Sequence, residues 1–282
     1  MDILATPGAD HGFADLVLGG RTRRLEYAWH ERERTGAPLL VFAHEGLGSL
    51  AMWKDFPGEL CAVAGMRGLS FSRAGYGRST PRAKDEKWPV DFMHRQAHEV
   101  LPALFAQLGV VDSPWLFGHS DGGSIALLYA AAFPDRVAGL VVVAPHVFVE
   151  DVTVASIERA RAAYETTDMR QKLARYHDDP DSAFRGWNDV WLDPQFRSWN
   201  IEACLPRIRC PVLAIQGEDD EYGTMAQVDA ITRLVPGARM LKLPGCGHSP
   251  HRDQPAALTA AVIAFLDEHR QVAMRAAMAA RS

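Results

Sequence analysis

Short apolar runs recur along the chain and alternate with stretches of helical periodicity. Six of these runs are typical of strands buried on both faces: LLVFAH (39–44), RGLSFS (67–72), PWLFGH (114–119), VAGLVVVAP (137–145), PVLAIQG (211–217) and ARMLKLPG (238–245). Two earlier segments, 13–18 and 25–29, are separated by a Gly-Gly pair and predict a hairpin.

Between these runs, apolar residues recur at helical spacing in residues 94–108, 124–133, 224–234 and 258–270. We expect the Ala/Arg-rich tail that follows the last of these segments to fray. Strands that alternate with helices predict an α/β fold, in which a mostly parallel, eight-stranded sheet carries helices on both faces.

The alternation stops between residues 148 and 206, where no strand is expected and two prolines interrupt helix-like stretches. A helical insertion between two strands is more often a cap than a linker, because linkers are polar. We therefore predict a cap at residues 147–206, inserted into a core of residues 1–146 and 207–282.

The predicted cap is rich in aromatic residues: Phe148, Tyr164, Tyr176, Phe184, Trp187, Trp191, Phe196 and Trp199. Most of them are expected to pack the cap onto the core. We expect about a third to face a cavity, with Trp187 and Trp191 among those that bind substrate.

Composition narrows the possible functions. The 282 residues carry 30 Lys and Arg against 35 Asp and Glu, a net charge of −5. This balance disfavours nucleic acid as a partner, because phosphate backbones are bound by clustered positive charge. No apolar window approaches the roughly 20 residues of a membrane span, and the first residues lack the core of a signal peptide. We expect a cytoplasmic protein with a small-molecule substrate and no membrane partner.

Cysteine and histidine spacing predicts neither disulfides nor a metal site. The four cysteines are irregularly spaced and form no CxxC pair, which is typical of free thiols in a reducing compartment. His94 and His98 lie four residues apart, but the glutamate and the third ligand of a zinc-protease motif are missing. We expect no metal and no cofactor.

The segment GHSDGG, residues 118–123, follows a predicted strand and precedes a predicted helix. A Gly-x-Ser-x-Gly in this position is the setting of a nucleophile elbow. Gly118 and Gly122 have a steric reason, because a side chain at either position would meet neighbouring backbone in so tight a turn. The hydroxyl of Ser120 is then exposed at the beginning of a helix, whose backbone N–H groups can stabilise an oxyanion.

A nucleophilic serine needs a base, and the base needs a carboxylate to orient it. Asp219 and Asp220 follow one of the later predicted strands, and His248 follows the last one. Because the carboxyl ends of parallel strands meet at one edge of a sheet, these side chains and Ser120 can share a site. His251 lies nearby and is expected at the rim of the cleft or in solvent.

With these residues the chain resembles the α/β-hydrolase family, in particular its capped members, from about residue 36 to residue 270. In that family the acid usually comes three residues after the glycine that ends its strand, which here is Asp220 after Gly217. The pair Gly247-His248, followed by DQP at 253–255, is also similar to the family pattern. The resemblance implies an α/β-hydrolase fold with Ser120, His248 and Asp220 as its catalytic triad.

One loop departs from that pattern. The segment GYGRS (75–79) resembles the loop after the family's fourth strand, but Ser72 and Ala74 replace its usual aspartate and arginine. The resemblance therefore leaves the contacts of this loop open.

The resemblance also implies two backbone donors for an oxyanion hole. Counted back from Trp53, Gly46 takes the position of one donor, and the N–H of Asp121 is the other. Glu45 stands where the family usually has glycine. A carboxylate there opposes developing negative charge unless it points away or pairs with a cation.

The side chains of Glu45 and Asp121 are therefore candidates for binding substrate. The GxSDGG elbow is similar to that of hydrolases acting on α-amino-acid esters, which implies that Asp121 contacts a substrate cation. The alternative is an acid that favours a helix N-terminus, worth about 0.3–1 kcal/mol.

These observations predict a serine hydrolase of small esters that works through an acyl-enzyme, with amine-bearing or aromatic esters as favoured substrates. Carbon–carbon bond hydrolases of ring-cleavage pathways share the triad and the aromatic cap. Their usual residues differ from His119, Asp121 and Ser249, so ester hydrolysis ranks first. The alternative of another class is a non-catalytic ligand-binding or receptor-like protein, since a fold does not determine a function.

Overall fold

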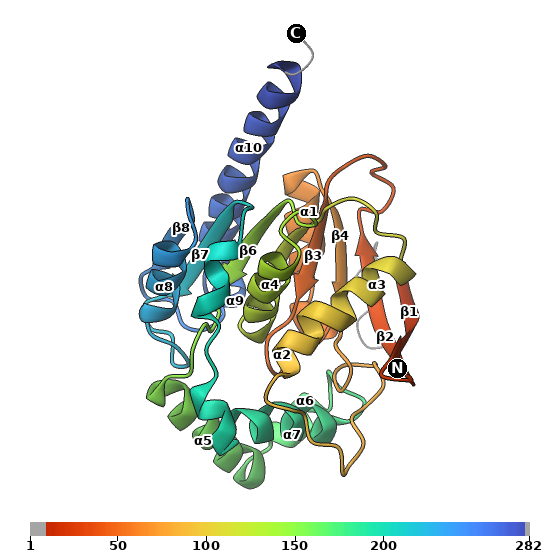
Figure 1. Ribbon diagram of the computed structural model, residues 1–282. Helices are drawn as coiled ribbons and strands as arrows, with labels where there is room; N and C mark the ends of the chain where they lie inside the picture. Colours follow the sequence, from red (N-terminus) through yellow and green to blue (C-terminus); the bar gives the residue numbers. More distant parts are fainter. Residues whose placement is uncertain (1–9, 280–282) are drawn as a thin grey trace.

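The computed structural model describes residues 10–279, and of residues 272–279 it describes the backbone alone. Within this part of the chain, eight strands form one sheet in the order β1-β2-β4-β3-β5-β6-β7-β8 (Figure 1). The strands are β1 (Asp10–Leu18), β2 (Arg21–His30), β3 (Leu39–Ala43), β4 (Arg67–Phe71), β5 (Trp115–His119), β6 (Gly139–Val143), β7 (Val212–Gly217) and β8 (Arg239–Leu243). All eight predicted strands are present, and the predicted α/β-hydrolase fold is confirmed.

The sheet is parallel from β4 to β8 and antiparallel at its other edge. Strands β1 and β2 form the predicted hairpin, and β2 pairs antiparallel with β4. The five central and later pairings, from β3–β4 to β7–β8, are parallel. Strands β3, β5, β6 and β7 are buried along their whole length, as their continuous apolar sequences require.

Helices cover both faces of the sheet (Figure 1). Two of them, α1 (Phe56–Ala64) and α10 (Pro255–Ala279), pack on one face. The other face carries α2 (Phe92–Arg95), the π-helical turn η2 (Gln96–Val100), α3 (Leu101–Gln107), α4 (Asp121–Ala132) and α8 (Ala226–Leu234). Two short elements, η1 (Ala51–Trp53) and α9 (Pro250–Asp253), lie in loops that follow β3 and β8.

The expectation that the chain frays after residue 270 is wrong for its backbone. Helix α10 continues to Ala279. The tail is rich in alanine and arginine, which have high intrinsic helix propensity, and no glycine or proline ends the helix before that point.

Between β6 and β7 the chain forms helices in place of strands. These are α5 (Asp151–Thr166), α6 (Met169–Leu173), α7 (Pro180–Trp191), and the 3-10 segments η3 (Pro194–Ser198) and η4 (Glu202–Arg207). Helices α5, α6 and α7 lie together beyond the ends of the strands, at the bottom of the view in Figure 1. A single bridge between Phe148 and Asn200 brings the two ends of this segment together. The boundaries 147–206 of a separate cap remain a prediction.

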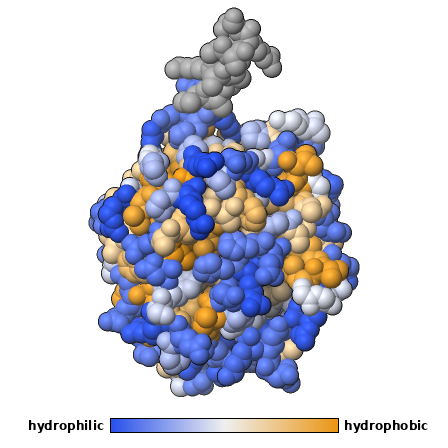
Figure 2. Space-filling model, viewed as in Figure 1, coloured by the Kyte–Doolittle hydropathy of each residue, from blue (hydrophilic) through white to orange (hydrophobic). Residues whose placement is uncertain are grey.

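The surface viewed in Figure 2 is mostly hydrophilic, with hydrophobic residues in separate small groups. None of the helices in the described part of the chain combines the length and the apolar character needed to cross a membrane.

Candidate active site

Ser120 lies in the turn between β5 and α4, in the geometry of a nucleophile elbow. Its backbone has a φ of 53° and a ψ of −120°, a conformation that is strained for a residue with a side chain. A Cβ at Gly118 would overlap the backbone of Gly122, and a Cβ at Gly122 would overlap the backbone of Ala43. Glycine is therefore required at both positions for the steric reason that the sequence predicted. The tight turn holds Ser120 at the beginning of α4.

His248 and Asp220 come from the loops after β8 and β7 and meet at hydrogen-bond distance. The Nδ1 of His248 lies 2.8 Å and 2.9 Å from the two carboxylate oxygens of Asp220. Asp220 also accepts hydrogen bonds from the backbone N–H of Tyr222 (2.8 Å) and from Nε2 of Gln216 (2.7 Å). These fixed donors hold the carboxylate in place and leave Nε2 of His248 available.

The pKa of His248 lies above its ordinary value of 6.5. Burial disfavours the imidazolium, but the hydrogen bond from its ring to Asp220 and the negative charge of that carboxylate outweigh burial. In the same pair, burial opposes the ionisation of Asp220, yet the contact with His248 lowers its pKa. The aspartate is thus a carboxylate that stabilises a protonated His248.

A small cavity of about 60 Å³ connects these groups with the helices between β6 and β7. Its lining residues are Glu45, Gly46, Leu47, Ser120, Asp121, His146, Thr153, Ile157, Trp187, Trp191, Tyr222 and His248. The hydrogen bonds of the described residues do not include one between Ser120 and His248, and such bonds often form only when substrate is present. Two of the eight aromatics of the predicted cap line this cavity, close to the expected third.

The backbone N–H groups of Gly46 and Asp121 have no hydrogen-bond partner among the described residues. Both residues line the cavity beside Ser120. Free N–H groups at this point can donate hydrogen bonds to an oxyanion, and the role of these two residues as its donors stays a prediction. A Cβ at Gly46 would overlap the indole of Trp187, which explains why glycine occupies this position.

The carboxylate of Asp121 is fully buried and already has two partners. Arg73 Nη1 lies 3.5 Å from one oxygen, and Trp191 Nε1 donates to the other at 3.1 Å. Burial raises the pKa of Asp121, although Arg73 and Trp191 both favour its ionised form. A substrate cation would therefore compete with an internal one at Asp121.

The carboxylate of Glu45 has weaker polar contacts within the protein than that of Asp121. Its side chain is 16% exposed, and its oxygens lie 3.4 Å from Nη2 of Arg252 and 3.7 Å from Nδ1 of His119. Burial opposes ionisation of Glu45, but the attraction of His119 and Arg252 outweighs it and lowers the pKa. Burial also lowers the pKa of His119 to about 4, so Arg252 is the neighbour that is charged at neutral pH.

Arg73 lies just before the loop whose contacts the sequence left open. It is the centre of a buried hydrogen-bond network beneath the site. It is 1% exposed, and its Nη2 donates to the backbone carbonyl of Glu45 at 2.7 Å. Its backbone N–H donates to Nε2 of His44 at 3.0 Å. Because Arg73 also contacts Asp121, it joins the two chain segments that supply the free N–H groups.

Sequence reasoning missed five residues that line the cavity, two of them with titratable rings: Leu47, His146, Thr153, Ile157 and Tyr222. His146 directly follows the run that forms β6, so its place at a strand end could have identified it. Burial lowers the pKa of His146 to about 3, and its ring packs against Trp191 with centroids 4.9 Å apart. Tyr222 follows Asp220 by two residues, and its ring centroid lies 4.8 Å from that of His248.

The expected position of His251 at the cleft rim or in solvent is wrong. The residue is 8% exposed and packs against the rings of Trp53 and His119, each at a centroid distance of 5.0 Å. His251 is the second residue of α9, and its side chain joins an aromatic cluster that includes Trp53, Phe56 and His119.

One group of potential metal ligands exists among the described residues. Ligand atoms of Glu45, His119 and His248 lie within 4.8 Å of one another. Zinc bonds to nitrogen of about 2.0–2.1 Å require donor atoms roughly 3.4 Å apart. The three groups would have to move together before they could hold an ion.

Comparison with known proteins agrees with this geometry. The model of the alpha/beta hydrolase family matches residues 40–262. A serine hydrolase of Homo sapiens, BPHL, is 30% identical over 195 residues, which are 65% of this chain and 63% of that protein. The mouse BPHL matches in the same way at 27%, so the match spans less than two thirds of these relatives' length.

A third relative and a solved structure match over greater lengths. A 2-succinyl-6-hydroxy-2,4-cyclohexadiene-1-carboxylate synthase of Enterobacter is 26% identical over 89% of this chain and 97% of its own. The structure of a thermophilic esterase from Thermogutta terrifontis superposes with a TM-score of 0.70 at 21% identity, over 93% of this chain and 99% of that chain. The family match covers most of the sequence, and the chain belongs to the alpha/beta hydrolase family.

Proposed function

We propose that this protein is a serine hydrolase of small carboxylic esters. The observation that carries the proposal is the placement of Ser120, at a strained strand-to-helix turn, in one cavity with His248, whose other ring nitrogen is held by Asp220. The names of relatives, a serine hydrolase and an esterase among them, support the same class of activity.

The first half of the reaction forms an acyl-enzyme. The hydroxyl oxygen of Ser120 attacks the ester carbonyl carbon while its proton passes to Nε2 of His248. The carbonyl electrons move to the oxygen, which the N–H groups of Gly46 and Asp121 stabilise. Collapse of this intermediate breaks the bond to the alkoxy group, and His248 returns the proton to the leaving alcohol.

The second half repeats these steps with water. His248 removes a proton from water, whose oxygen attacks the acyl carbon, and the bond to Ser120 then breaks. The serine regains its proton from His248, and the carboxylic acid is released. Asp220 stabilises the imidazolium in both halves without taking its proton.

Arg73 supports the oxyanion hole from behind. Its guanidinium donates to the carbonyl of the Glu45–Gly46 peptide, whose N–H is one of the two donors. In a trans peptide the C=O and N–H point in opposite directions, so this contact turns the N–H of Gly46 away from Arg73. The other side of the guanidinium contacts Asp121, the residue of the second donor.

The cavity favours substrates with a compact acyl group. Its volume of about 60 Å³ lies well below the ~300–1,000 Å³ of common ligand pockets. Trp187 and Trp191 form an apolar wall suited to a small aliphatic or aromatic group. The incompletely satisfied carboxylate of Glu45, more than that of Asp121, favours an acyl group that carries an ammonium.

Hydrolysis of p-nitrophenyl acetate and butyrate tests the proposal. We expect turnover that is lost in Ser120→Ala, with the acetate preferred because the cavity is small. A variant such as Ser113→Ala, at an exposed serine far from the cavity, is the matched control and should retain full activity. If the wild type hydrolyses no ester of such a panel, the proposed function is wrong.

A further inference from the structure

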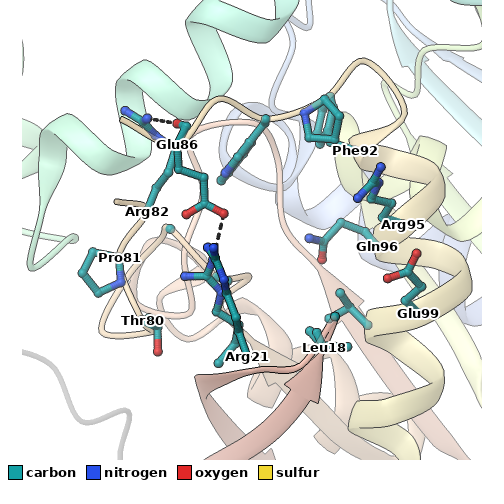
Figure 3. Close-up of a pocket in the computed structure, with 17 residues that line it drawn as sticks. Leu18, Arg21, Thr80, Pro81, Arg82, Glu86, Phe92, Arg95, Gln96 and Glu99 are labelled. Atoms are coloured by element: carbon teal, nitrogen blue, oxygen red, sulfur yellow. Dashed lines mark hydrogen bonds and ion pairs between the residues drawn. The ribbon is translucent and has the colours of Figure 1, made fainter. Parts of the chain in front are cut away.

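A second cavity, of about 250 Å³, lies away from the catalytic one and shares no lining residue with it. Its walls come from the turn between β1 and β2, from the loop at residues 74–89, and from α2 with η2. Figure 3 shows Arg21, Arg82 and Glu86 on one side of the cavity, facing Phe92, Arg95 and Glu99 on the other. We name it the hairpin cavity.

The charged side chains of the hairpin cavity are predominantly positive. Four arginines line it (Arg21, Arg23, Arg82 and Arg95), against two glutamates, Glu86 and Glu99. The whole protein has a net charge of −5, so this excess of positive charge runs against the overall balance. A cavity that concentrates one sign of charge attracts ligands of the opposite sign.

The guanidinium groups are not all satisfied within the protein. Arg23 pairs with Glu86 at 2.7 Å, and Arg95 with Asp91 at 3.0 Å. Arg21 has no ion pair with any residue from 10 to 271, and Nε of Arg82 is buried without a hydrogen-bond partner in the same part of the chain. An unpartnered buried donor is costly and marks a place where a ligand acceptor can bind.

Strand geometry brings two of these cations together. Arg21 and Arg23 are two residues apart on β2, so their side chains leave the same face of the strand. Both reach the cavity, Arg21 from an exposed position and Arg23 from deeper in the wall. Arg23 already pairs with Glu86 at 2.7 Å, so Arg21 supplies the free donors for a planar carboxylate and Arg23 adds positive charge beside it.

Part of the remaining wall is apolar, although Thr80 and Gln96 also line it. Trp88 and Phe92 stack with ring centroids 5.8 Å apart, and Leu18 and Val100 line the cavity with them. The main chain adds the π-helical turn η2, an irregularity that is common at functional sites. An apolar wall beside a cationic rim suits a ligand with an acidic head and a short hydrocarbon body.

We propose that the hairpin cavity binds a small amphiphilic carboxylate, with its head at Arg21 and Arg23 and its chain against Trp88 and Phe92. The proposed binding site is argued from the residues that line this cavity and does not depend on the proposed ester hydrolysis. Trp88 also packs against Gly186 of α7, the neighbour of Trp187 in the catalytic cavity. Occupancy therefore changes the environment of an indole that lies between the core and α7.

Isothermal titration calorimetry of the intact protein with hexanoate tests the site, with hexan-1-ol and hexylammonium as probes of equal chain length. We expect hexanoate to bind at least tenfold more tightly than either. Arg21→Gln, at an exposed position where folding is not at risk, should weaken hexanoate binding at least tenfold. Arg209→Gln removes an equally exposed charge outside the cavity and should leave binding unchanged.

Three results would overturn the proposal. Equal binding of hexanoate and hexylammonium would show that the arginines do not select charge. Unchanged hexanoate affinity in Arg21→Gln would place the binding site elsewhere, the catalytic cavity included. Tighter binding of hexyl phosphate than of hexanoate would assign the cavity to phosphate esters instead of carboxylates. Because binding is measured directly, a failure here is independent of any failure of ester hydrolysis.

Discussion

Replacement of Glu45 by glutamine tests whether a carboxylate beside Ser120, the proposed nucleophile, selects substrates by charge. The matched substrates are L-alanine ethyl ester and ethyl propanoate, which differ only in the amino group. At pH 7 the amino group is largely protonated, and an ammonium in the cavity can contact Glu45. The variant keeps the size of the side chain and removes its charge.

The magnitude follows from the contacts of Glu45. Its cationic neighbour Arg252 lies at 3.4 Å, longer than the ~2.7–2.9 Å of a charge-assisted hydrogen bond. An ammonium at normal distance would gain about 1.5–3 kcal/mol, less what Arg252 already neutralises. We therefore expect kcat/KM for the alanine ester to fall on the order of 10- to 100-fold in Glu45→Gln, since about 1.4 kcal/mol corresponds to a factor of ten.

The comparison must be made as a ratio of the two substrates, because Glu45 also raises the pKa of His248. That effect changes the general base equally for both esters and cancels in the ratio. Initial rates by pH-stat titration measure both substrates, neither of which carries a chromophore. If Glu45→Gln lowers kcat/KM for ethyl propanoate as much as for the alanine ester, the carboxylate does not select substrates by charge and the reasoning is refuted.

Three further predictions concern the buried groups of the site. Asp121→Asn leaves the guanidinium of Arg73 buried without its counter-charge, so we expect the free energy of unfolding in urea to fall by roughly 3–5 kcal/mol. Below the pKa of His248 the base is protonated, so kcat/KM should rise with pH through an inflection above 6.5. Asp220→Asn should move that inflection to lower pH and reduce kcat by about 10⁴-fold, as stopped-flow or long-time assays can show. Gly46→Ala forces the oxyanion loop away from the indole above it, so we expect a loss of at least about tenfold in kcat and a lower unfolding midpoint, because the added methyl group overpacks a buried contact; a folded variant with full activity would exclude this N–H as a donor.

The elements and the elbow could be predicted because their signals are local. A strand buried on both faces needs a continuous apolar run, and each of the six predicted runs contains one of the strands β3 to β8. The expected burial on both faces is wrong for β8, which lies at the edge of the sheet and is only partly buried. The elbow needs glycine at 118 and 122 for contacts with backbone close in space, so its sequence pattern carries its geometry. His248 and Asp220 were predicted in the same way, from positions directly after strands, and they lie at hydrogen-bond distance from each other.

The charge partners of the site could not be predicted, because they depend on contacts between distant segments. Asp121 and Arg73 are 48 residues apart, and their pairing depends on how the loop after β4 approaches the elbow. The same is true of Glu45 and Arg252, which are 207 residues apart. His251 was misplaced for a related reason, since nothing in its neighbourhood indicates the aromatic cluster that buries it.

These partners change the meaning of the two carboxylates. By position alone, both Glu45 and Asp121 oppose an oxyanion and both could attract a substrate cation. Arg73 removes that opposition at Asp121, and the same guanidinium holds the carbonyl of Glu45, so the acid at 121 becomes part of the framework that orients two N–H donors. Arg252 lies as close to Glu45, at 3.4 Å, as Arg73 does to Asp121, at 3.5 Å, but Arg252 is 48% exposed, so solvent screens its charge. The charge that a substrate can experience in this site is therefore mainly that of Glu45, which stands where relatives in the family usually have a glycine without any charge.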